Sequence, residues 1–356
     1  MKSLSKGINC CSLGKINNYS VVILSMAATR AAFAELIGQD VRVELHRLRK
    51  LSFYGIPSEV RGEVWKRLLL ALPSSEEVLE SVSAYGDSTR SRGGASTLLS
   101  REDGHNVDDG NDDKHELLSD GRMMVVVKSE LGRFRGGVHD FFRKTKSAER
   151  VHSLLGSYLQ SGDVSVGDGR NFERDEAQLL VRLAAPLAYV FKKQSVAAMC
   201  FTSFMRGLEG RFALRNRKRI LANFMMLFRS RLPDLHTHFE EEVESSEWAK
   251  SWLNGLLCRE LPFHDLLRLW DTYFSVPDGF ELHTCVCVAI LEHFKEDLED
   301  LDRSELIAFL DRLPPMDIDQ IVTRSQHIAL DFNVKNGVSS SSSATRSAAV
   351  AWSSEV

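Results

Sequence analysis

Apolar residues recur at spacings of three and four along most of this chain, the period of a helix with one buried face. In residues 58–72, Val60, Val64, Leu68 and Leu72 lie four apart. Similar spacing recurs in residues 147–160, 176–193, 218–239, 248–274, 283–298, 304–313 and 316–330. We find no credible strand and no clear internal repeat elsewhere, so the pattern predicts an all-α fold built from many short helices.

Local signals indicate where several of these helices begin. We expect Ser58 and Ser304 to cap the helices that follow them. Asp317 and Gln320 have the spacing of a capping box. Pro186 should kink its helix or mark the first turn. The valines and cysteines of residues 283–298 would also suit a short buried strand, but the length of the segment favours a helix.

Three regions lack this periodicity, and they set the predicted domain organisation. Residues 1–40 are weakly patterned, and Met26 reads like an alternative start to Met1. Residues 76–120 are rich in Ser, Gly and Asp and hold few apolar side chains, so we expect a disordered insertion. Residues 334–356 form a serine-rich tail. The remaining sequence, 41–333, is predicted to be one helical domain.

Composition narrows the class of protein. The chain has 356 residues, of which 43% are hydrophobic and 26% charged, with a formal net charge of −4. These values are ordinary for a soluble globular protein and argue against a nucleic-acid binder. The six cysteines include no C-x-x-C pair, which indicates a reducing compartment and core cysteines. No apolar run is long enough to span a bilayer, so we expect a cytoplasmic protein.

The sequence lacks the residue spacing that a metal site or a phosphate-binding loop would require. His236 and His238 lie two apart, which would splay them on a helix, so we expect no metal site. No G-x-x-x-x-G-K-S/T occurs, so the chain is not itself predicted to be a GTPase. We therefore expect no cofactor of its own.

Two short motifs stand out from the helical background. The turn Gly55-Ile56-Pro57 leads into a helix with Arg61 and Trp65 four residues apart on one face. Taken alone, that pair indicates only a cation beside an aromatic ring on an amphipathic helix.

The second motif is Arg268-Leu269-Trp270-Asp271, within "RELPFHDLLRLWDTYF". With the Gly-Ile-Pro turn, it makes residues 45–333 resemble a TBC domain, the all-helical GTPase-activating module for Rab-type small GTPases. The stretch "FLDRLPPMDIDQI" is also similar to this family, and to a subgroup that regulates mitotic-exit GTPases in fungi. The resemblance implies that Arg61, Trp65, Arg268, Trp270 and Asp271 are structural.

The resemblance also implies two catalytic residues supplied to the partner GTPase. The family's I-x-x-D-x-x-R spacing falls on Val127, Glu130 and Arg133, with glutamate in place of aspartate as the residue that holds the arginine. Phe134 follows where the family usually has threonine. Arg133 would be an arginine finger, since a cation inserted in trans neutralises charge developing on the phosphates. Arg135 and Arg143 lie nearby as substitutes.

The family's second motif, Y-x-Q-G, is eroded here. Aligning "LAAPL" with the family places Gln178 on the glutamine, which could position the attacking water. Glu176 replaces the tyrosine. Leu179 replaces the glycine, and we expect its side chain to crowd a partner. Alternatively, Gln178 is only an exposed polar residue.

The motifs together predict a protein that binds a GTP-loaded small GTPase, of the Rab or mitotic-exit type, and accelerates its GTP hydrolysis. The alternative is a non-catalytic scaffold that kept the fold and binds a partner without stimulating hydrolysis. A third interpretation is a helical adaptor unrelated to GTPases. Any recruitment to membranes would come through the partner.

Overall fold

All regular structure in the described part of the chain is helical, which confirms the predicted all-α fold. The computed structural model describes residues 30–38, 45–71, 120–134, 139–160, 174–212, 214–243, 246–276 and 279–335. The helices are α2 (Leu45–Phe53), α3 (Ser58–Leu70), α6 (Asp120–Leu131), α7 (His139–Phe142), α8 (Thr145–Gln160), α9 (Arg174–Val190), α10 (Gln194–Phe212), α11 (Leu214–Arg231), α12 (Pro233–Glu242), α13 (Ser246–Gly255), α14 (Phe263–Ser275), α15 (His283–His293), α16 (Lys295–Glu299), α17 (Arg303–Asp311) and α18 (Ile318–Lys335).

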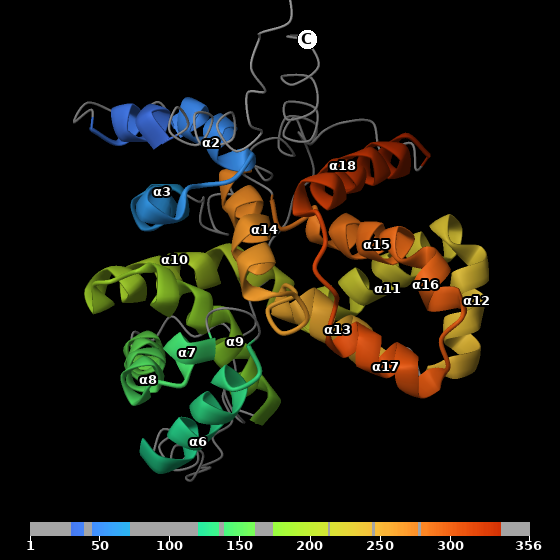
Figure 1. Ribbon diagram of the computed structural model, residues 1–356, viewed down its shortest axis with the longest axis horizontal. Helices are drawn as coiled ribbons and strands as arrows, with labels where there is room; N and C mark the ends of the chain where they lie inside the picture. Colours follow the sequence, from blue (N-terminus) through green and yellow to red (C-terminus); the bar gives the residue numbers. More distant parts are fainter. Residues whose placement is uncertain are drawn as a thin grey trace, which may run out of the picture.

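Helix α14 lies near the centre of the molecule (Figure 1). It contacts α2 and α3 from the N-terminal half and α18 from the C-terminal end. Helices α6, α8, α9 and α10 pack against one another as a second group, and α11, α15 and α18 pack as a third. The buried apolar side chains of these groups form one continuous core. Helix α6, which ends just before Arg133, and helix α9, which contains Gln178, therefore pack into the same core.

Packing begins earlier than the predicted boundary at residue 41. Residues 30–38 are helical, and Phe33 is fully buried. Arg67 of α3 donates a hydrogen bond from Nη2 to the carbonyl oxygen of Ile37, at 3.0 Å. Helix α18 likewise extends to Lys335, two residues into the predicted tail. Residues 76–119 of the predicted insertion and 336–356 lie outside the described residues, and the division into domains stays a prediction.

Two predicted helix caps are wrong. Pro57 occupies the N-cap position of α3, so Ser58 is already helical, and its hydroxyl donates to Glu59 Oε2 at 3.3 Å. Asp302, two residues before Ser304, caps α17. Its Oδ1 accepts from the backbone N of Glu305 at 2.9 Å, while Glu305 Oε2 accepts from the backbone N of Asp302 at 3.1 Å. In this reciprocal pair, each carboxylate satisfies one otherwise free backbone donor.

The remaining local signals have mixed outcomes. Asp317, the residue before α18, accepts through Oδ1 from the backbone N of Gln320 at 3.3 Å, which is one half of the predicted capping box; the Gln320 side chain donates to Asp317 Oδ2. Pro186 lies inside α9, which continues to Val190, so it does not mark the first turn of that helix. Residues 283–293 form a helix, as their length predicted, and Pro262 separates α13 from α14.

A buried carboxylate, that of Asp271, joins the two sequence motifs. Asp271 has no exposed surface. Its oxygens accept from Arg61 Nε and Nη2, each at 3.1 Å, from Trp65 Nε1 at 2.7 Å and from the backbone N of Ile56 at 2.9 Å. Complete burial raises the pKa of the Asp271 carboxyl, while Arg61 and the other donors act to lower it. The predicted structural role of Arg61 and Asp271 is therefore a direct contact across 210 residues.

The glycine of the Gly-Ile-Pro turn is required by both its backbone and its neighbour. Gly55 has a φ of +104°, and a Cβ placed there would lie 3.0 Å from Arg268 Nε. Arg268 passes over this turn and donates to Thr272 Oγ1 at 2.8 Å and to the carbonyl oxygen of Phe53 at 3.0 Å. It also pairs with Asp319 of α18. Arg268 thus connects α14 to the α2–α3 turn and to the last helix.

The two motif tryptophans are buried together. Trp65 and Trp270 have no exposed surface, and their ring centroids lie 6.3 Å apart. Trp65 meets Phe274 edge to face at 4.8 Å, and Trp270 contacts Phe204 of α10 at 5.2 Å. These rings fill the space between α3, α10 and α14, as the family resemblance implied.

A buried histidine, His283, contacts Tyr273 of α14. His283 Nε2 is 2.9 Å from the carbonyl oxygen of Trp252, so this nitrogen carries the proton, and Nδ1 accepts from the Tyr273 hydroxyl at 2.7 Å. Burial is the main cause that lowers the pKa of His283 to about 3. The imidazole is therefore neutral in the folded protein at physiological pH.

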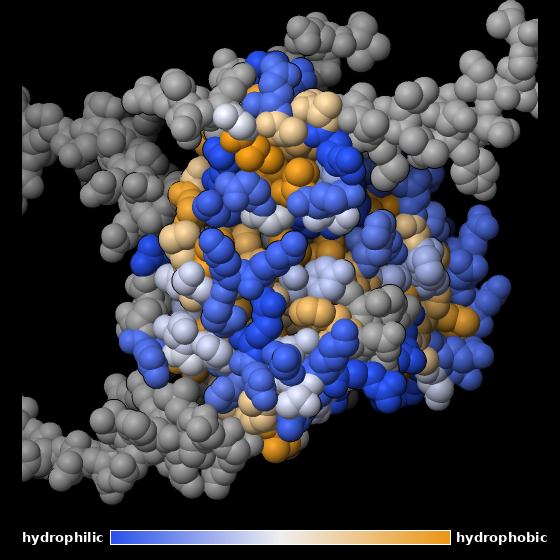
Figure 2. All heavy atoms as spheres, turned by 60° about the vertical axis from the view of Figure 1, so that its left-hand side comes forward, coloured by the Kyte–Doolittle hydropathy of each residue, from blue (hydrophilic) through white to orange (hydrophobic). Residues whose placement is uncertain are grey.

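One face of the molecule shows how polar and apolar side chains are distributed on it. In the face shown in Figure 2, hydrophilic residues predominate and apolar ones show as small patches between them. Among the described helices, none combines the length and the apolar character needed to cross a bilayer. The cysteines within the described ranges, Cys200, Cys258, Cys285 and Cys287, are buried and unpaired, which agrees with their predicted place in the core.

Replacing Asp271 by asparagine should lower the free energy of unfolding by about 3–5 kcal/mol, because it leaves the Arg61 guanidinium buried without a counter-charge. Urea titration followed by circular dichroism measures this loss. Asp331→Asn is the matched control, since Asp331 pairs with Arg231 but is 55% exposed, and should cost no more than about 1 kcal/mol. Equal small effects in both variants would contradict a structural role for the Asp271 contacts.

Truncation of either motif tryptophan, as Trp65→Ala or Trp270→Ala, should cost about 3–5 kcal/mol, the range for a core aromatic. The same urea titration tests this. If both variants unfold at the parent's midpoint, the packing described around α14 is incorrect.

Lowering the pH should destabilise the protein through His283. Its pKa is about 3 when folded and about 6.5 in an unfolded chain, so the unfolded state binds the proton first. The stability that neutral His283 contributes is fully present above pH 6.5 and is lost as the pH falls toward 3. At pH 5 this effect lowers the free energy of unfolding by roughly 2 kcal/mol. The fall in unfolding free energy between pH 7 and pH 5 should be smaller in His283→Gln by that amount. His264→Gln, at an 89% exposed side chain, should behave as the parent does.

Candidate functional site

The end of α6 presents the predicted arginine finger. Val127 and Leu131 lie on the buried face of this helix. The turn that follows the helix lies at the surface. Arg133 lies in that turn, and its backbone N donates to the carbonyl oxygen of Glu130 at 3.0 Å. The side chain of Arg133 is 45% exposed, so its guanidinium is accessible to a partner protein.

The residue after Arg133 fixes the turn. Phe134 is buried, and its ring lies 5.0 Å from that of Phe142 and 5.8 Å, edge to face, from that of Phe263. Tyr189 of α9 completes this aromatic cluster, 5.0 Å from Phe263. The phenylalanine found where the family usually has threonine therefore attaches the finger turn to α7, α9 and α14.

Glu130 is buried beneath Arg133. Its side chain is 1% exposed, and its Oε1 forms an ion pair with Arg133 Nη1 at 3.6 Å. Its Oε2 accepts a hydrogen bond from Arg182 Nε of α9 at 2.8 Å. The sequence predicted that Glu130 holds Arg133, and the geometry brings the two together. The closer contact, however, is to Arg182, which the sequence analysis missed.

Arg182 could have been found from its position in the sequence. It interrupts the apolar run "LLVRLAAPLAYV" and lies four residues after Gln178, which places both side chains on one face of a helix. In the structure Arg182 Nη2 donates to Gln178 Oε1 at 3.4 Å. The side chain of Arg182 is 13% exposed, so it lies below the surface on which Arg133 is accessible.

The structure thus connects Arg133 to Gln178 through Glu130 and Arg182. Gln178 is half-buried, and its carbonyl oxygen accepts from Arg182 at 3.4 Å. Leu179 is buried, so the expectation that its side chain crowds a partner is wrong. The helix turns this position toward the core.

The substitutes named for Arg133 are placed differently. Arg143 is exposed in the turn between α7 and α8, and among the described residues no contact joins it to Glu130 or Arg182. Arg135 lies outside the described residues. The structural motif, with Arg61, Trp65 and Asp271, forms its own buried contacts around α14, apart from this cluster.

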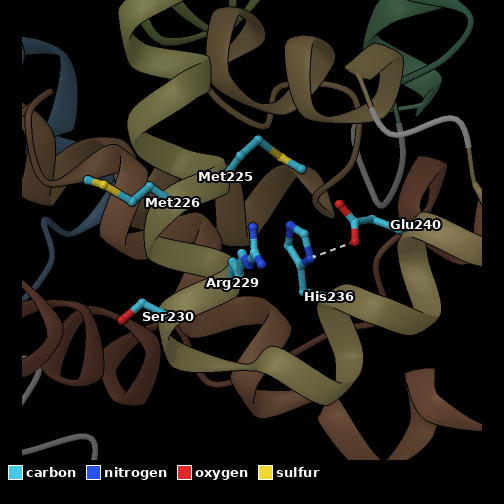
Figure 3. Close-up of a pocket in the computed structure, with 6 residues that line it drawn as sticks. All are labelled: Met225, Met226, Arg229, Ser230, His236 and Glu240. Carbon is cyan, nitrogen blue, oxygen red and sulfur yellow. Dashed lines mark ion pairs between the residues drawn. The ribbon is translucent and has the colours of Figure 1, made fainter.

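A separate hollow of about 610 Å³ lies between α11 and α12 (Figure 3). Its lining residues are Met225, Met226, Arg229, Ser230, His236 and Glu240. His236 Nδ1 lies 3.5 Å from Glu240 Oε2, while His238 faces the carbonyl oxygen of Leu301. In the ranges that the structure describes, no three His, Cys, Asp or Glu side chains gather as metal ligands.

Known proteins resemble this chain in sequence and in fold. Residues 178–299 match the family model described as Rab-GTPase-TBC domain. The chain is 27% identical over 327 residues to TBC1 domain family member 22A of Homo sapiens, a match that covers 85% of this chain and 60% of that protein. It is 25% identical over 314 residues to human TBC1 domain family member 22B, covering 79% and 56%.

This chain is similar to the TBC-domain family. Its fold is similar to the crystal structure of the Ypt/Rab-GAP domain of Gyp1p, with a TM-score of 0.58 at 18% identity over 86% of this chain and 99% of that one. A Chlamydomonas flagellar RabGAP TBC domain gives a TM-score of 0.55 at 14% identity, covering 87% and 93%. The chain spans less than two thirds of the length of the curated relatives named above.

The matched range bears on the two predicted catalytic residues differently. It begins at Gln178 and includes the Leu-Trp-Asp motif of α14. Glu130 and Arg133 precede it, so their assignment within the TBC family rests on their spacing and on their place beside Arg182 and Gln178.

Proposed function

We propose that this protein binds a GTP-loaded Rab-type small GTPase and accelerates its GTP hydrolysis by supplying Arg133 in trans. The observation that carries the proposal is that Arg133 and Gln178, 45 positions apart in the sequence, are connected through two side chains. Arg133 pairs with Glu130, Glu130 with Arg182, and Arg182 with Gln178. A half-exposed arginine that is loosely paired in this way can reach a phosphate of a partner. The nucleotide and its Mg²⁺ would come with the partner.

Arg133 would act through its charge and shape. A small GTPase hydrolyses GTP slowly because negative charge that develops on the phosphates is poorly neutralised. The guanidinium is a permanent planar cation with several N–H donors, which suits phosphate oxygens. Since Glu130 contacts Arg133 only at 3.6 Å, the guanidinium keeps donors free for such oxygens.

Gln178 would play a smaller part. Its carbonyl oxygen accepts from Arg182 at 3.4 Å, which uses one of the two lone pairs of that oxygen. Its NH₂ group can act as a donor. We propose that Gln178 donates a hydrogen bond to the partner near the nucleotide, and that positioning of the attacking water falls mainly to the GTPase itself.

A scaffold that binds a GTPase without stimulating hydrolysis is the second candidate. The lost tyrosine and glycine of the Gln178 motif favour it, and the contact between the Gln178 oxygen and Arg182 restrains the orientation of the amide. Binding of a mitotic-exit GTPase in place of a Rab-type one remains a prediction from the sequence.

Replacing Arg133 by alanine should reduce stimulated GTP hydrolysis by about 10³-fold, since the cation that neutralises the phosphates is removed. The measurement is phosphate release from a panel of GTP-loaded Rab-type GTPases, at protein concentrations that saturate binding. Gln178→Ala should reduce the rate much less, by roughly tenfold.

Arg143→Ala is the matched control, because it removes an exposed arginine from the neighbouring turn. It should retain the parent's rate. If Arg143→Ala loses stimulation while Arg133→Ala keeps it, the finger is wrongly assigned. If the unaltered protein binds a GTP-loaded partner and stimulates none, the scaffold function is correct.

A further inference from the structure

Glu130 contacts two cations of unequal accessibility. Arg182 is 13% exposed and donates to Oε2 at 2.8 Å, whereas Arg133 is 45% exposed and stays 3.6 Å from Oε1. Oε1 is buried, and no hydrogen bond to it is found in the described part of the chain. The carboxylate is therefore held firmly by one arginine and loosely by the other.

This inequality matters when Arg133 moves toward a phosphate. A buried carboxylate that loses its only cation is strongly destabilised, because neither water nor another charge compensates it. Arg182 remains hydrogen-bonded to Glu130 whatever Arg133 does, so the negative charge stays paired. The cost of withdrawing Arg133 is correspondingly small.

We infer that Arg182 is a positioning residue for the proposed GTPase activation: it neutralises Glu130 so that Arg133 is free to transfer from that carboxylate to the phosphates of the bound nucleotide. The inference rests on the proposed function. Arg182 also fixes Gln178 through Oε1 at 3.4 Å, so one guanidinium sets the state of both predicted catalytic side chains.

Removal of the Arg182 charge tests the inference. In Arg182→Met, Glu130 retains only Arg133, which should become bound to it and unavailable. The single-turnover rate of stimulated hydrolysis at saturating protein should fall about 10- to 100-fold. Affinity for the same GTPase loaded with a non-hydrolysable GTP analogue should change less than about threefold, since ground-state docking does not require Arg133 to transfer. The GTPase used is the one in the panel that the unaltered protein stimulates most.

A second substitution separates this role from a merely structural one. In Arg182→Met with Glu130→Gln, no buried charge remains to retain Arg133, so the rate should recover to within about fivefold of the parent. Arg182→Lys keeps a cation near Glu130 and should retain most of the activity. Arg324→Met is the matched control, because Arg324 of α18 also donates from Nε to a glutamate, Glu292 of α15, at 2.8 Å; it should leave the rate within twofold.

The outcomes are distinct. If the unaltered protein stimulates no GTPase, the proposed function fails and this inference fails with it. If the protein is active and Arg182→Met matches it, only the inference is overturned. Failure of the folded double variant to recover activity also overturns it, and that comparison stands even if Arg182→Met alone does not fold.

Discussion

The architecture depends on one buried carboxylate, that of Asp271, and on the donors that surround it. Its two oxygens receive hydrogen bonds from Arg61, Trp65 and the backbone of Ile56, which brings α3 and the turn before it against α14. An isolated carboxylate in this position would be prohibitively costly. The contacts therefore require one arrangement of these helices, and the aromatic packing of Trp65 and Trp270 follows from it.

Glu130 is a second buried carboxylate, and its different surroundings suit a different role. Asp271 is fully satisfied by donors that are themselves buried, so nothing there is free to move. Glu130 has one firm partner, Arg182, and one partly exposed partner, Arg133. The first arrangement holds helices in place; the second presents a cation at the surface with little cost for its release. The same physical constraint, that buried charge must be paired, thus accounts for both rigidity and availability.

Several residues of the candidate site differ from the family motifs that they resemble. Glutamate stands at the aspartate position, leucine at the glycine position and phenylalanine at the usual threonine position. The leucine and the phenylalanine are buried, so both side chains pack into the core. The oxygen of Gln178 is engaged by an arginine of its own helix. This contact makes the scaffold alternative worth testing beside the catalytic one.

The sequence by itself determined the helical class, most helix positions and the burial of the motif residues, because periodicity, turn residues and a family pattern are local properties of the chain. Even locally it placed the cap of α17 at Ser304, since competing cap residues two positions apart differ only in which backbone donors they reach. Tertiary structure alone decided that Asp271 meets Arg61, that Leu179 points inward and that Glu130 pairs with Arg182. Those outcomes depend on which charges and apolar faces are brought together, and the two charge pairs join residues that are 52 and 210 positions apart in the sequence. These long-range contacts cannot be inferred from a local sequence pattern. They form because the folded chain must bury apolar surface and leave no buried charge unpaired.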